Sequence, residues 1–218
     1  MQPYFFPYAG YFRLFSAADT FVILDCVQLP RPGWVHRNRF MNAEGRFDWL
    51  TLPLAKASYT TPIRDLHLRP EARSVLEASF RRFPVLRDAL KAKHPLLARV
   101  LDISSPDLTA YLSGLLAEVT QTLGLSKPMV RSSELGLDPA LQAQDRVLAI
   151  VKALGGTRYV NAPGGRHLYD SESFARCGVQ LQFLTEYGAG MESTLSRLLT
   201  EPARALSEEI ERESVLVD

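Results

Sequence analysis

The chain has 218 residues, of which 46% are hydrophobic and 22% are charged, and its formal net charge at pH 7 is +1. This length and composition suit a globular protein with a sizeable core, so no disulfide or metal is needed for stability. The net charge gives no general argument for binding nucleic acid or a membrane surface. Two cysteines without metal-ligand spacing, and the lack of an apolar run of transmembrane length, indicate a cytoplasmic protein with no metal site.

The first 40 residues concentrate aromatic and polar groups around one apolar run. Residues 2–10 contain three aromatic rings besides Tyr8, and a helical stretch is expected at residues 11–19. Residues 21–24 are apolar without alternation, which predicts a strand buried on both faces, as in parallel sheets covered by helices. Ligands bind beyond the carboxyl ends of such strands. We therefore expect Asp25, Cys26 and Gln28, which follow this strand, to belong to a site.

The rest of the chain alternates strand and helix signals. Residues 40–54 predict a hairpin with its turn at 42–45, and the alternation at residues 63–68 predicts a half-buried strand. Helical spacing dominates residues 70–124. Further strands are expected at 129–131, before the glycine-rich turn that ends at Gly165, and at 178–184, where the alternation fits an edge or a half-exposed position. Helices are expected from residue 138 and over 194–212, the latter interrupted at Pro202.

These elements predict an α/β fold with a central, mostly parallel, Rossmann-like sheet and helices on both faces. Residues 1–200 are expected to form one domain with a helical insertion at about 70–124. Residues 201–218 are expected to form an acidic C-terminal helix or tail, with six acids against Arg204 and Arg212.

A basic strip follows the predicted site. Residues 28–64 carry six Lys or Arg against Glu44 and Asp48. Arg37 and Lys56 are the best candidates to hold a phosphate or carboxylate. An anionic small molecule such as a sugar nucleotide or an acyl donor is therefore the expected partner. Aminoacyl-tRNA is possible as a donor, although the net charge does not favour it, and the sequence identifies no cofactor.

Two kinds of chemistry remain open at the strand end. Cys26 paired with His36 or His167 would form a thiol–imidazole nucleophile, whereas Asp25 with His36 would suit acid–base catalysis. The Pro-Arg-Pro-Gly sequence at 30–33 would let His36 fold back onto the strand end. Because adjacent strand residues face opposite sides, we expect Asp25 to face the site and Cys26 to pack.

Five separated motifs, at residues 2–12, 25–28, 34–39, 51–59 and 159–165, together resemble the WbqC-like family over about residues 1–200. Members of that family typically occur among bacterial genes for surface polysaccharides and modified amino sugars. The resemblance implies an enzyme that attaches an aminoacyl or similar acyl group to an amine, such as that of an amino sugar. The motif residues carried onto this chain are Gln2, Tyr4, Pro7, Gly10, Asp25, Gln28, Trp34, Arg37, Asn38, Lys56, Ser58, Tyr59, Asn161, Gly164 and Gly165.

The chain departs from the family pattern in two places. Family members usually have a short strand before the Gln-Pro-Tyr loop, which this sequence does not show. Many carry an acid or a small polar residue where this chain has Cys26, which argues against an obligatory cysteine nucleophile. The Tyr8-Ala-Gly-Tyr11 turn is also similar in layout to the His-x-Gly-His turn of nucleotidylyltransferases, so a nucleotide pocket without adenylyl transfer is conceivable.

The function expected from these features is amide formation on an amino sugar or related amine. The alternatives are a nucleotide- or sugar-nucleotide-binding enzyme of another class, or a non-catalytic partner in a biosynthetic assembly. The candidate catalytic residues are Asp25, Cys26, His36, Arg37 and Lys56. The candidate substrate-binding residues are Gln2, Tyr4, Tyr8, Gly10, Gln28, Trp34, Asn38, Arg39, Ser58, Tyr59, Asn161, Gly164 and Gly165.

Overall fold

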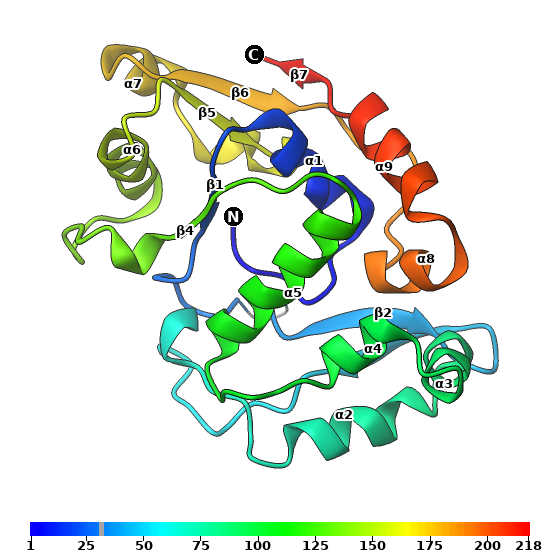
Figure 1. Ribbon diagram of the computed structural model, residues 1–218. Coiled ribbons are helices and arrows are strands. Elements are labelled where there is room, and N and C mark those ends of the chain that lie inside the picture. Colours follow the sequence, from blue (N-terminus) through cyan, green and yellow to red (C-terminus); the bar gives the residue numbers. More distant parts are fainter. Residues whose placement is uncertain (31–32) are drawn as a thin grey trace.

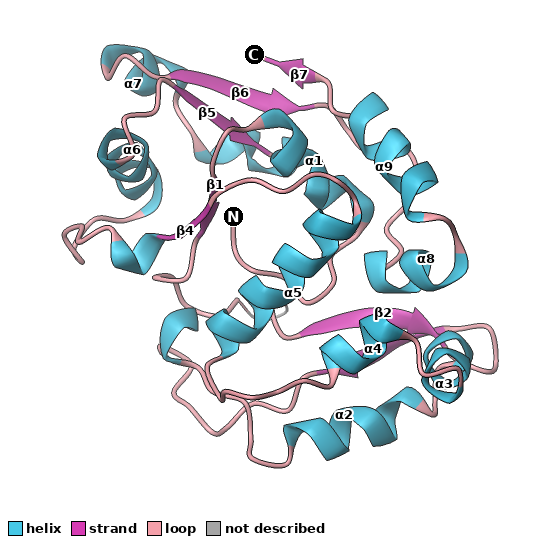
Figure 2. Ribbon diagram, in the orientation of Figure 1, coloured by secondary structure: helices cyan, strands magenta, loops and turns pink. Residues whose placement is uncertain are grey.

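The computed structural model describes residues 1–30 and 33–218, and the strands of these residues lie in three small sheets (Figures 1 and 2). Strand β1 (Phe21–Ile23) pairs in parallel with β4 (Met129–Arg131). Strands β2 (Arg37–Met41) and β3 (Phe47–Thr51) form an antiparallel hairpin. Strands β5 (Arg158–Asn161) and β6 (Gln180–Leu184) are parallel, with β7 (Leu216–Val217) antiparallel beside β6. The α/β class is confirmed, but the expected central sheet is not continuous.

Helices surround these sheets, and capping residues and prolines explain many of their ends. Pro84 and Pro95 occupy the first turns of their helices, and the Asp107 and Asp170 side chains cap two others. The helices are α1 (Ala9–Ala17), α2 (Ala72–Phe80), α3 (Pro84–Lys91), α4 (Pro95–Val100), α5 (Leu108–Thr122), α6 (Ala143–Ala153), α7 (Ser171–Arg176), α8 (Thr194–Thr200) and α9 (Ala203–Arg212). Short 3₁₀ turns are η1 (Ile63–Asp65), η2 (Ser132–Glu134) and η3 (Pro163–Leu168).

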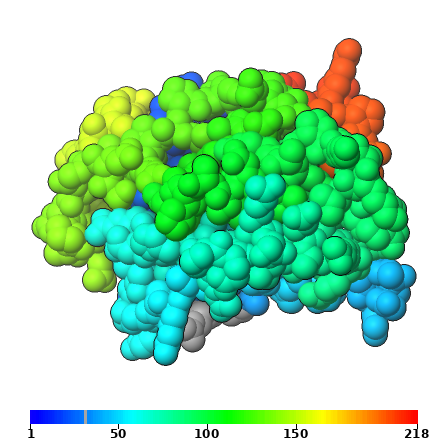
Figure 3. Space-filling model, turned by 60° about the horizontal axis from the view of Figure 1, so that its bottom comes forward, coloured from blue at the N-terminus to red at the C-terminus, as the bar shows by residue number. Residues whose placement is uncertain are grey.

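Two apolar clusters form the core. The larger one joins α1 and the β2–β3 hairpin to α2–α5, α8 and α9. The smaller one lies between α6, α7 and β6, around Phe174. The cyan and green segments that carry α2 to α5 make up much of the face seen in Figure 3. Residues 72–122 therefore form a helical layer over the hairpin.

Three local predictions differ from the structure. Residues 63–68 form turn η1 and isolated bridges, because the N–H groups of Ile63 and Arg64 bond the carbonyls of Val27 and Asp25 instead of a strand. Strand β6 is half-exposed, as one of the two expected positions has it, but it is not at an edge because β7 covers its other side. Helix α6 begins at Ala143, since the Asp138 side chain first closes a turn onto the N–H of Ala140.

The C-terminal segment is part of the fold. Leu206 and Ile210 of α9 are fully buried, and α9 packs against α1. Glu208 and Glu211 of the same helix are exposed, so α9 is an amphipathic helix.

Candidate functional site

A cavity of about 550 Å³ lies at the carboxyl ends of β5 and β6, beside the N-terminal loop. We call it the tyrosine cavity. Such an end of parallel strands is where ligands usually bind. Its lining comprises Met1, Gln2, Tyr4, Pro7, Tyr8, Tyr11, Leu14, Leu24, Trp34, Asn38, Tyr159, Asn161, Ala162, Pro163, Gly164, Gly165, Leu168, Tyr169, Glu186, Tyr187 and Met191.

The N-terminal loop is held in a strained shape next to this cavity. Phe6 has φ +47°, a left-handed conformation that costs roughly 1–2 kcal/mol for a residue with a Cβ. The Asn38 amide donates to the carbonyls of Phe5, at 3.1 Å, and of Phe6. The Ser193 hydroxyl donates to the Phe6 carbonyl at 3.0 Å, and the Thr194 N–H donates to the Pro7 carbonyl at 3.0 Å. The loop is therefore preorganised by distant parts of the chain.

Tyrosine rings form most of the cavity wall. The ring centroids of Tyr4 and Tyr11 are 5.5 Å apart, and those of Tyr8 and Tyr187 are 5.6 Å apart. Burial raises the pKa of Tyr4 and of Tyr8, so both phenols stay protonated at neutral pH. The Tyr11 hydroxyl is already used, because it donates to the Gln2 carbonyl at 2.8 Å. Tyr4 and Tyr8 thus offer hydroxyl groups to a ligand.

Glycine at position 10 makes the packing of two of these rings possible. A Cβ on Gly10 would overlap the Tyr8 ring and would lie 2.8 Å from Cγ of Tyr187. At Gly165 a Cβ would lie 3.2 Å from Cγ of Asn161, whereas at Gly164 it would meet nothing within 4 Å. Gly10 and Gly165 therefore shape the cavity through close approach of side chains.

Among the described residues, Glu186 supplies the one carboxyl side chain of the lining, which contains no Lys, Arg or His side chain. It lies between Thr185 and Tyr187, and the buried Arg13 anchors this segment to α1. The Arg13 guanidinium donates to the carbonyls of Thr185, at 2.9 Å, and of Glu213, at 2.7 Å. The cavity therefore combines aromatic walls with a single carboxylate.

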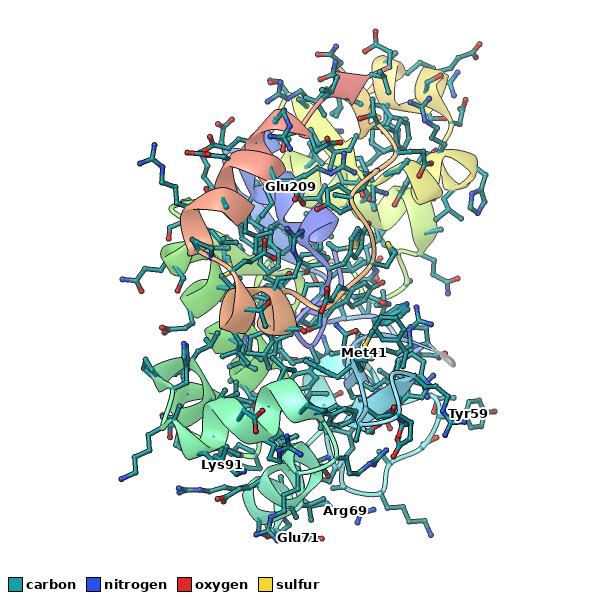
Figure 4. The ribbon with its side chains drawn as sticks, turned by 90° about the vertical axis from the view of Figure 1, so that its right-hand side faces the viewer. Met41, Tyr59, Arg69, Glu71, Lys91 and Glu209 are labelled. Carbon is teal, nitrogen blue, oxygen red and sulfur yellow. The ribbon has the colours of Figure 1, made fainter. Side chains whose placement is uncertain are left out.

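An ion-pair network on α8 and α9 binds the hydroxyl of Tyr187 and fixes the position of its ring. Its hydroxyl donates to Glu209, and Arg197 donates two hydrogen bonds to the Glu209 carboxylate at 2.7 and 2.9 Å. Glu209 is seen on α9 in Figure 4. Arg197 also pairs with Glu201 at 3.0 Å. This network fixes one wall of the tyrosine cavity.

We expect this network to make stability depend on acid pH. The hydrogen bonds from Arg197 hold the pKa of Glu209 below its usual value of 4.5. A lowered folded-state pKa contributes stability above the unfolded value, and this contribution is lost as pH falls below about 4.5 toward the folded pKa. Melting temperatures at pH 7 and pH 3.5 should differ less in Glu209→Gln than in the wild type. An equal difference in both would contradict the assignment.

Eight of the residues predicted from the sequence line the tyrosine cavity, and Gly10 lies directly against the ring of one of them, Tyr8. The eight are Gln2, Tyr4, Tyr8, Trp34, Asn38, Asn161, Gly164 and Gly165. The remaining candidates, which do not line the cavity, are Asp25, Cys26, Gln28, His36, Arg37, Arg39, Lys56, Ser58 and Tyr59.

We expected Asp25 to face the site, but its side chain does not line the tyrosine cavity. Its side chain is fully buried, and its carboxylate accepts hydrogen bonds from Ser132 Oγ at 2.9 Å, Ser133 N at 3.0 Å and Ser133 Oγ at 2.7 Å. These contacts join the ends of β1 and β4, because Ser132 follows β4 directly. A catalytic role for Asp25 stays a prediction, and its observed contacts are those of a structural anchor.

Cys26 lies beside an arginine instead of an imidazole. The Cys26 sulfur accepts from Arg146 Nη1 at 3.2 Å and Ser132 Oγ at 3.1 Å, and the residue is partly buried. No hydrogen bond joins it to His36 or His167 in the part of the chain that the structure describes. Arg31 and Pro32 of the proline-rich loop expected to bring His36 back lie outside the described residues.

His36 is partly buried and does not line the tyrosine cavity. Burial, and then the charge of Arg37, lower its pKa from 6.5. Its Nδ1 is buried and has no hydrogen-bond partner among the described residues. A catalytic role for His36 stays a prediction.

The predicted basic strip lies on the hairpin and the following loop, outside the cavity. The guanidinium of Arg37 lies 4.2 Å from the Trp49 ring centroid, and that of Arg39 lies 5.2 Å from the Trp34 ring centroid. Lys56 and Ser58 are exposed in the loop after β3, and Tyr59, 71% exposed, points away from the molecule (Figure 4). Trp34 is the link between the two regions, because it also lines the cavity.

Sequence reasoning missed the wall that follows β6. Glu186, Tyr187 and Met191 lie in a glycine-containing segment at the carboxyl end of that strand. The strand-end rule that selected Asp25 would have selected these residues too.

The described residues contain neither a metal-binding cluster nor a membrane-spanning helix. No cluster of three or more His, Cys, Asp or Glu side chains has an arrangement suited to a metal ion. None of the helices in the described part is both long and apolar enough to cross a membrane.

Parallel strands followed by helices, with an aromatic cavity at the strand ends, define an α/β protein with a candidate ligand site at that edge. The family model of the WbqC-like proteins matches residues 2–189, and the chain belongs to that family. It is 25% identical over 190 residues to the uncharacterized protein Rv1507c of Mycobacterium tuberculosis, covering 83% of this chain and 78% of the relative. No solved structure matches the chain.

Proposed function

We propose that the protein is a transferase that forms an amide on an amino sugar or related amine bound in the tyrosine cavity. The observation that carries the proposal is the composition of the lining. Among the described residues, Glu186 is its one carboxylate, and aromatic rings line the same cavity. Aromatic faces attract an ammonium group by about 0.5–2 kcal/mol, and a carboxylate pairs with it. An anion would find no lining Lys, Arg or His side chain in the described residues.

The same groups suit the chemistry of acyl transfer. The amine nitrogen would attack the carbonyl carbon of an acyl donor, a C–N bond would form, and the donor's leaving group would depart with its bonding electrons. The bound ammonium must lose one proton before the attack, and the Glu186 carboxylate would accept it. The second proton, lost as the C–N bond forms, would leave with the donor's leaving group. The hydroxyls of Tyr4 and Tyr8 and the amide of Gln2 would orient the sugar hydroxyls. The resemblance described above suggests surface-polysaccharide or modified-sugar metabolism as the setting.

An anionic part of the ligand would extend over the hairpin. Arg37 and Arg39 have no carboxylate within 4.0 Å among the described residues, and both lie against tryptophan rings. Trp34 connects this surface to the tyrosine cavity. This arrangement favours a nucleotide-linked sugar or an anionic acyl donor as the second candidate ligand.

A thermal-shift experiment with matched ligands tests the proposal. An amino sugar, its N-acetylated counterpart, and the nucleotide-linked form of each would be added at equal concentration. A ligand at 100 times its Kd stabilises by about 2.7 kcal/mol, which for this size raises Tm by roughly 5–10 °C. We expect a shift from the free amines but not from the acetylated forms. Equal shifts from both members of each pair would contradict an amine-binding cavity.

Glu186→Gln should weaken binding of the amine ligand at least about tenfold while leaving Tm nearly unchanged. The change removes the charge that pairs with the ammonium but keeps the size of an exposed side chain. Glu44→Gln, on the exposed hairpin turn, is the matched control and should bind normally. Titration calorimetry would measure both, and an unchanged Kd in Glu186→Gln would remove Glu186 from the site.

A further inference from the structure

The hairpin of β2 and β3 exposes one side that carries arginines and aromatic rings. Side chains alternate along each strand, so every second pair of the register points to the same side. Phe40 and Leu50 point inward and are buried, whereas Met41 (labelled in Figure 4) is 49% exposed and Phe47 is 54% exposed. We call the exposed side the hairpin face, and its residues are Arg37, Arg39, Met41, Phe47, Trp49 and Thr51.

The hairpin face is cationic and has no acid of its own. Asp48 is the one acid of the two strands, and it lies opposite Phe40 on the inner side, where it pairs with Arg82 next to α2. Arg37 uses its Nε to donate to the Gly33 carbonyl at 3.1 Å, which leaves its terminal nitrogens for a ligand. The side chain of Arg39 makes no hydrogen bond or ion pair among the described residues. The charge of this face therefore favours an anionic partner.

Flat groups form a continuous row on the hairpin face. The Arg39 guanidinium lies 5.2 Å from the Trp34 ring centroid and 5.8 Å from that of Phe47. The same guanidinium lies 5.8 Å from the Trp49 ring centroid, and the two tryptophan centroids are 5.2 Å apart. Phe47 and Arg39 are exposed, so each presents a plane to solvent. The row offers stacking surfaces as well as positive charge.

This row fits a short run of nucleobases. Bases stack on aromatic rings and on guanidinium planes, while their phosphates pair with arginine. Residues 37–41 extend over about 13 Å, at roughly 3.3 Å per residue, and sheets with such rings stack two or three bases. A single nucleotide would occupy only part of the row. An acidic peptide would match the charge but would leave the flat groups without stacking partners.

We propose that the hairpin face binds roughly two or three unpaired nucleotides at the end of an RNA, which brings the acyl group to the tyrosine cavity as a ribose ester. Trp34 contacts Arg39 and also lines the tyrosine cavity, so the last nucleotide lies at the cavity edge. The donor role rests on the proposed amide formation, whereas the RNA site rests on the hairpin contacts. Two or three phosphates need only a local group of cations, so the net charge of +1 does not oppose binding.

A ribose ester completes the transfer step. The amine nitrogen forms the C–N bond, and the bond between the carbonyl carbon and the ribose oxygen breaks. The ribose oxygen leaves with the bonding electrons and takes the second proton of the amine, while the first proton is on Glu186. The products are an amide and an RNA with a free ribose hydroxyl, so no further reactant is required.

Fluorescence anisotropy with an end-labelled adenylate RNA hexamer tests the RNA site without amine or ester. With two phosphates at Arg37 and Arg39, the logarithm of affinity should fall against the logarithm of salt with a slope of about −1.4. Phe47→Ala should weaken binding at least about tenfold, because a stacking plane is lost, and Phe47→Tyr should keep it. Arg39→Gln should weaken binding at least about fivefold. Arg73→Gln, an equal change of charge on exposed α2, is the control and should bind normally.

The same measurement distinguishes the other occupants of the hairpin face. ADP that binds as tightly as the hexamer would make the site a mononucleotide site. A polyglutamate peptide that binds more tightly than the hexamer would make it a docking surface for an acidic protein. Either result, or equal binding of the hexamer to Phe47→Ala and the wild type, would overturn the proposal.

A transfer experiment separates this inference from the proposed function. Glucosamine is incubated with a short RNA that carries a terminal glycyl ester or, as the control, with glycine ethyl ester, and mass spectrometry measures the amide. We expect product from the RNA ester at least about tenfold faster, and a loss of this advantage in Arg39→Gln. Equal rates from the two esters would overturn the donor role of RNA but not amide formation. RNA binding at the hairpin with no amide from either ester would overturn the proposed function and the donor role, and would leave the RNA site supported.

Discussion

Asp25→Ala should lower the free energy of unfolding by about 2–4 kcal/mol, because it leaves buried donors without an acceptor. The carboxylate accepts three hydrogen bonds from Ser132 and Ser133 and is fully buried. It also holds the end of β1 against the end of β4. For a chain of this size the expected fall in Tm is roughly 5–15 °C, measured by calorimetry.

An exposed aspartate before β1 provides the matched control. Asp19→Ala should leave Tm within about 1–2 °C of the wild type, since surface changes usually cost little. Asp25→Asn keeps the shape but turns an N–H₂ group toward donors, so an intermediate loss is expected. If Asp25→Asn kept its Tm and lost transferase activity, the carboxylate would be catalytic as the sequence first suggested.

Two of the segments predicted from the sequence line the tyrosine cavity. The aromatic run predicted residues 2–8, and the glycine-rich turn after a strand predicted Asn161 to Gly165. Short-range patterns carried this information. Short-range patterns also predicted the β2–β3 turn, where Gly45 has φ +71°. They predicted the break at Pro202 between α8 and α9 as well.

The rest of the site depends on contacts between residues that are far apart in the sequence, and no local sequence pattern predicts such contacts. Asp25 and Ser132 are 107 positions apart, and their hydrogen bond turns the carboxylate away from the cavity. Arg197 and Glu209 fix Tyr187 from two helices. The charge count of residues 28–64 correctly showed a basic strip, but it could not show that Arg37 and Arg39 lie on tryptophan rings outside the cavity. The strand predicted from the alternation at residues 63–68 is wrong, because the N–H groups at its start bond the backbone carbonyls of Val27 and Asp25.

Gly10→Ala should reduce ligand binding at least about tenfold while the protein still folds. The added Cβ would overlap the Tyr8 ring and lie 2.8 Å from Cγ of Tyr187, so both rings must move within the cavity wall. Overpacking of this kind typically costs about 1–3 kcal/mol, or roughly 2–12 °C in Tm. The backbone of Gly10 is helical, so alanine also brings a favourable helix propensity that offsets part of this cost.

Gly164→Ala separates a steric effect from a general loss of glycine. Gly164 lines the same cavity, but a Cβ there would meet nothing within 4 Å, so this variant should bind with little change. The double variant Gly10→Ala with Tyr8→Leu removes the ring that the new methyl group overlaps. It should recover most of the lost stability but not the binding, because the Tyr8 hydroxyl and ring face are gone. Calorimetry and ligand titration would measure both quantities. If Gly10→Ala bound as the wild type does, the two rings would not shape the ligand site.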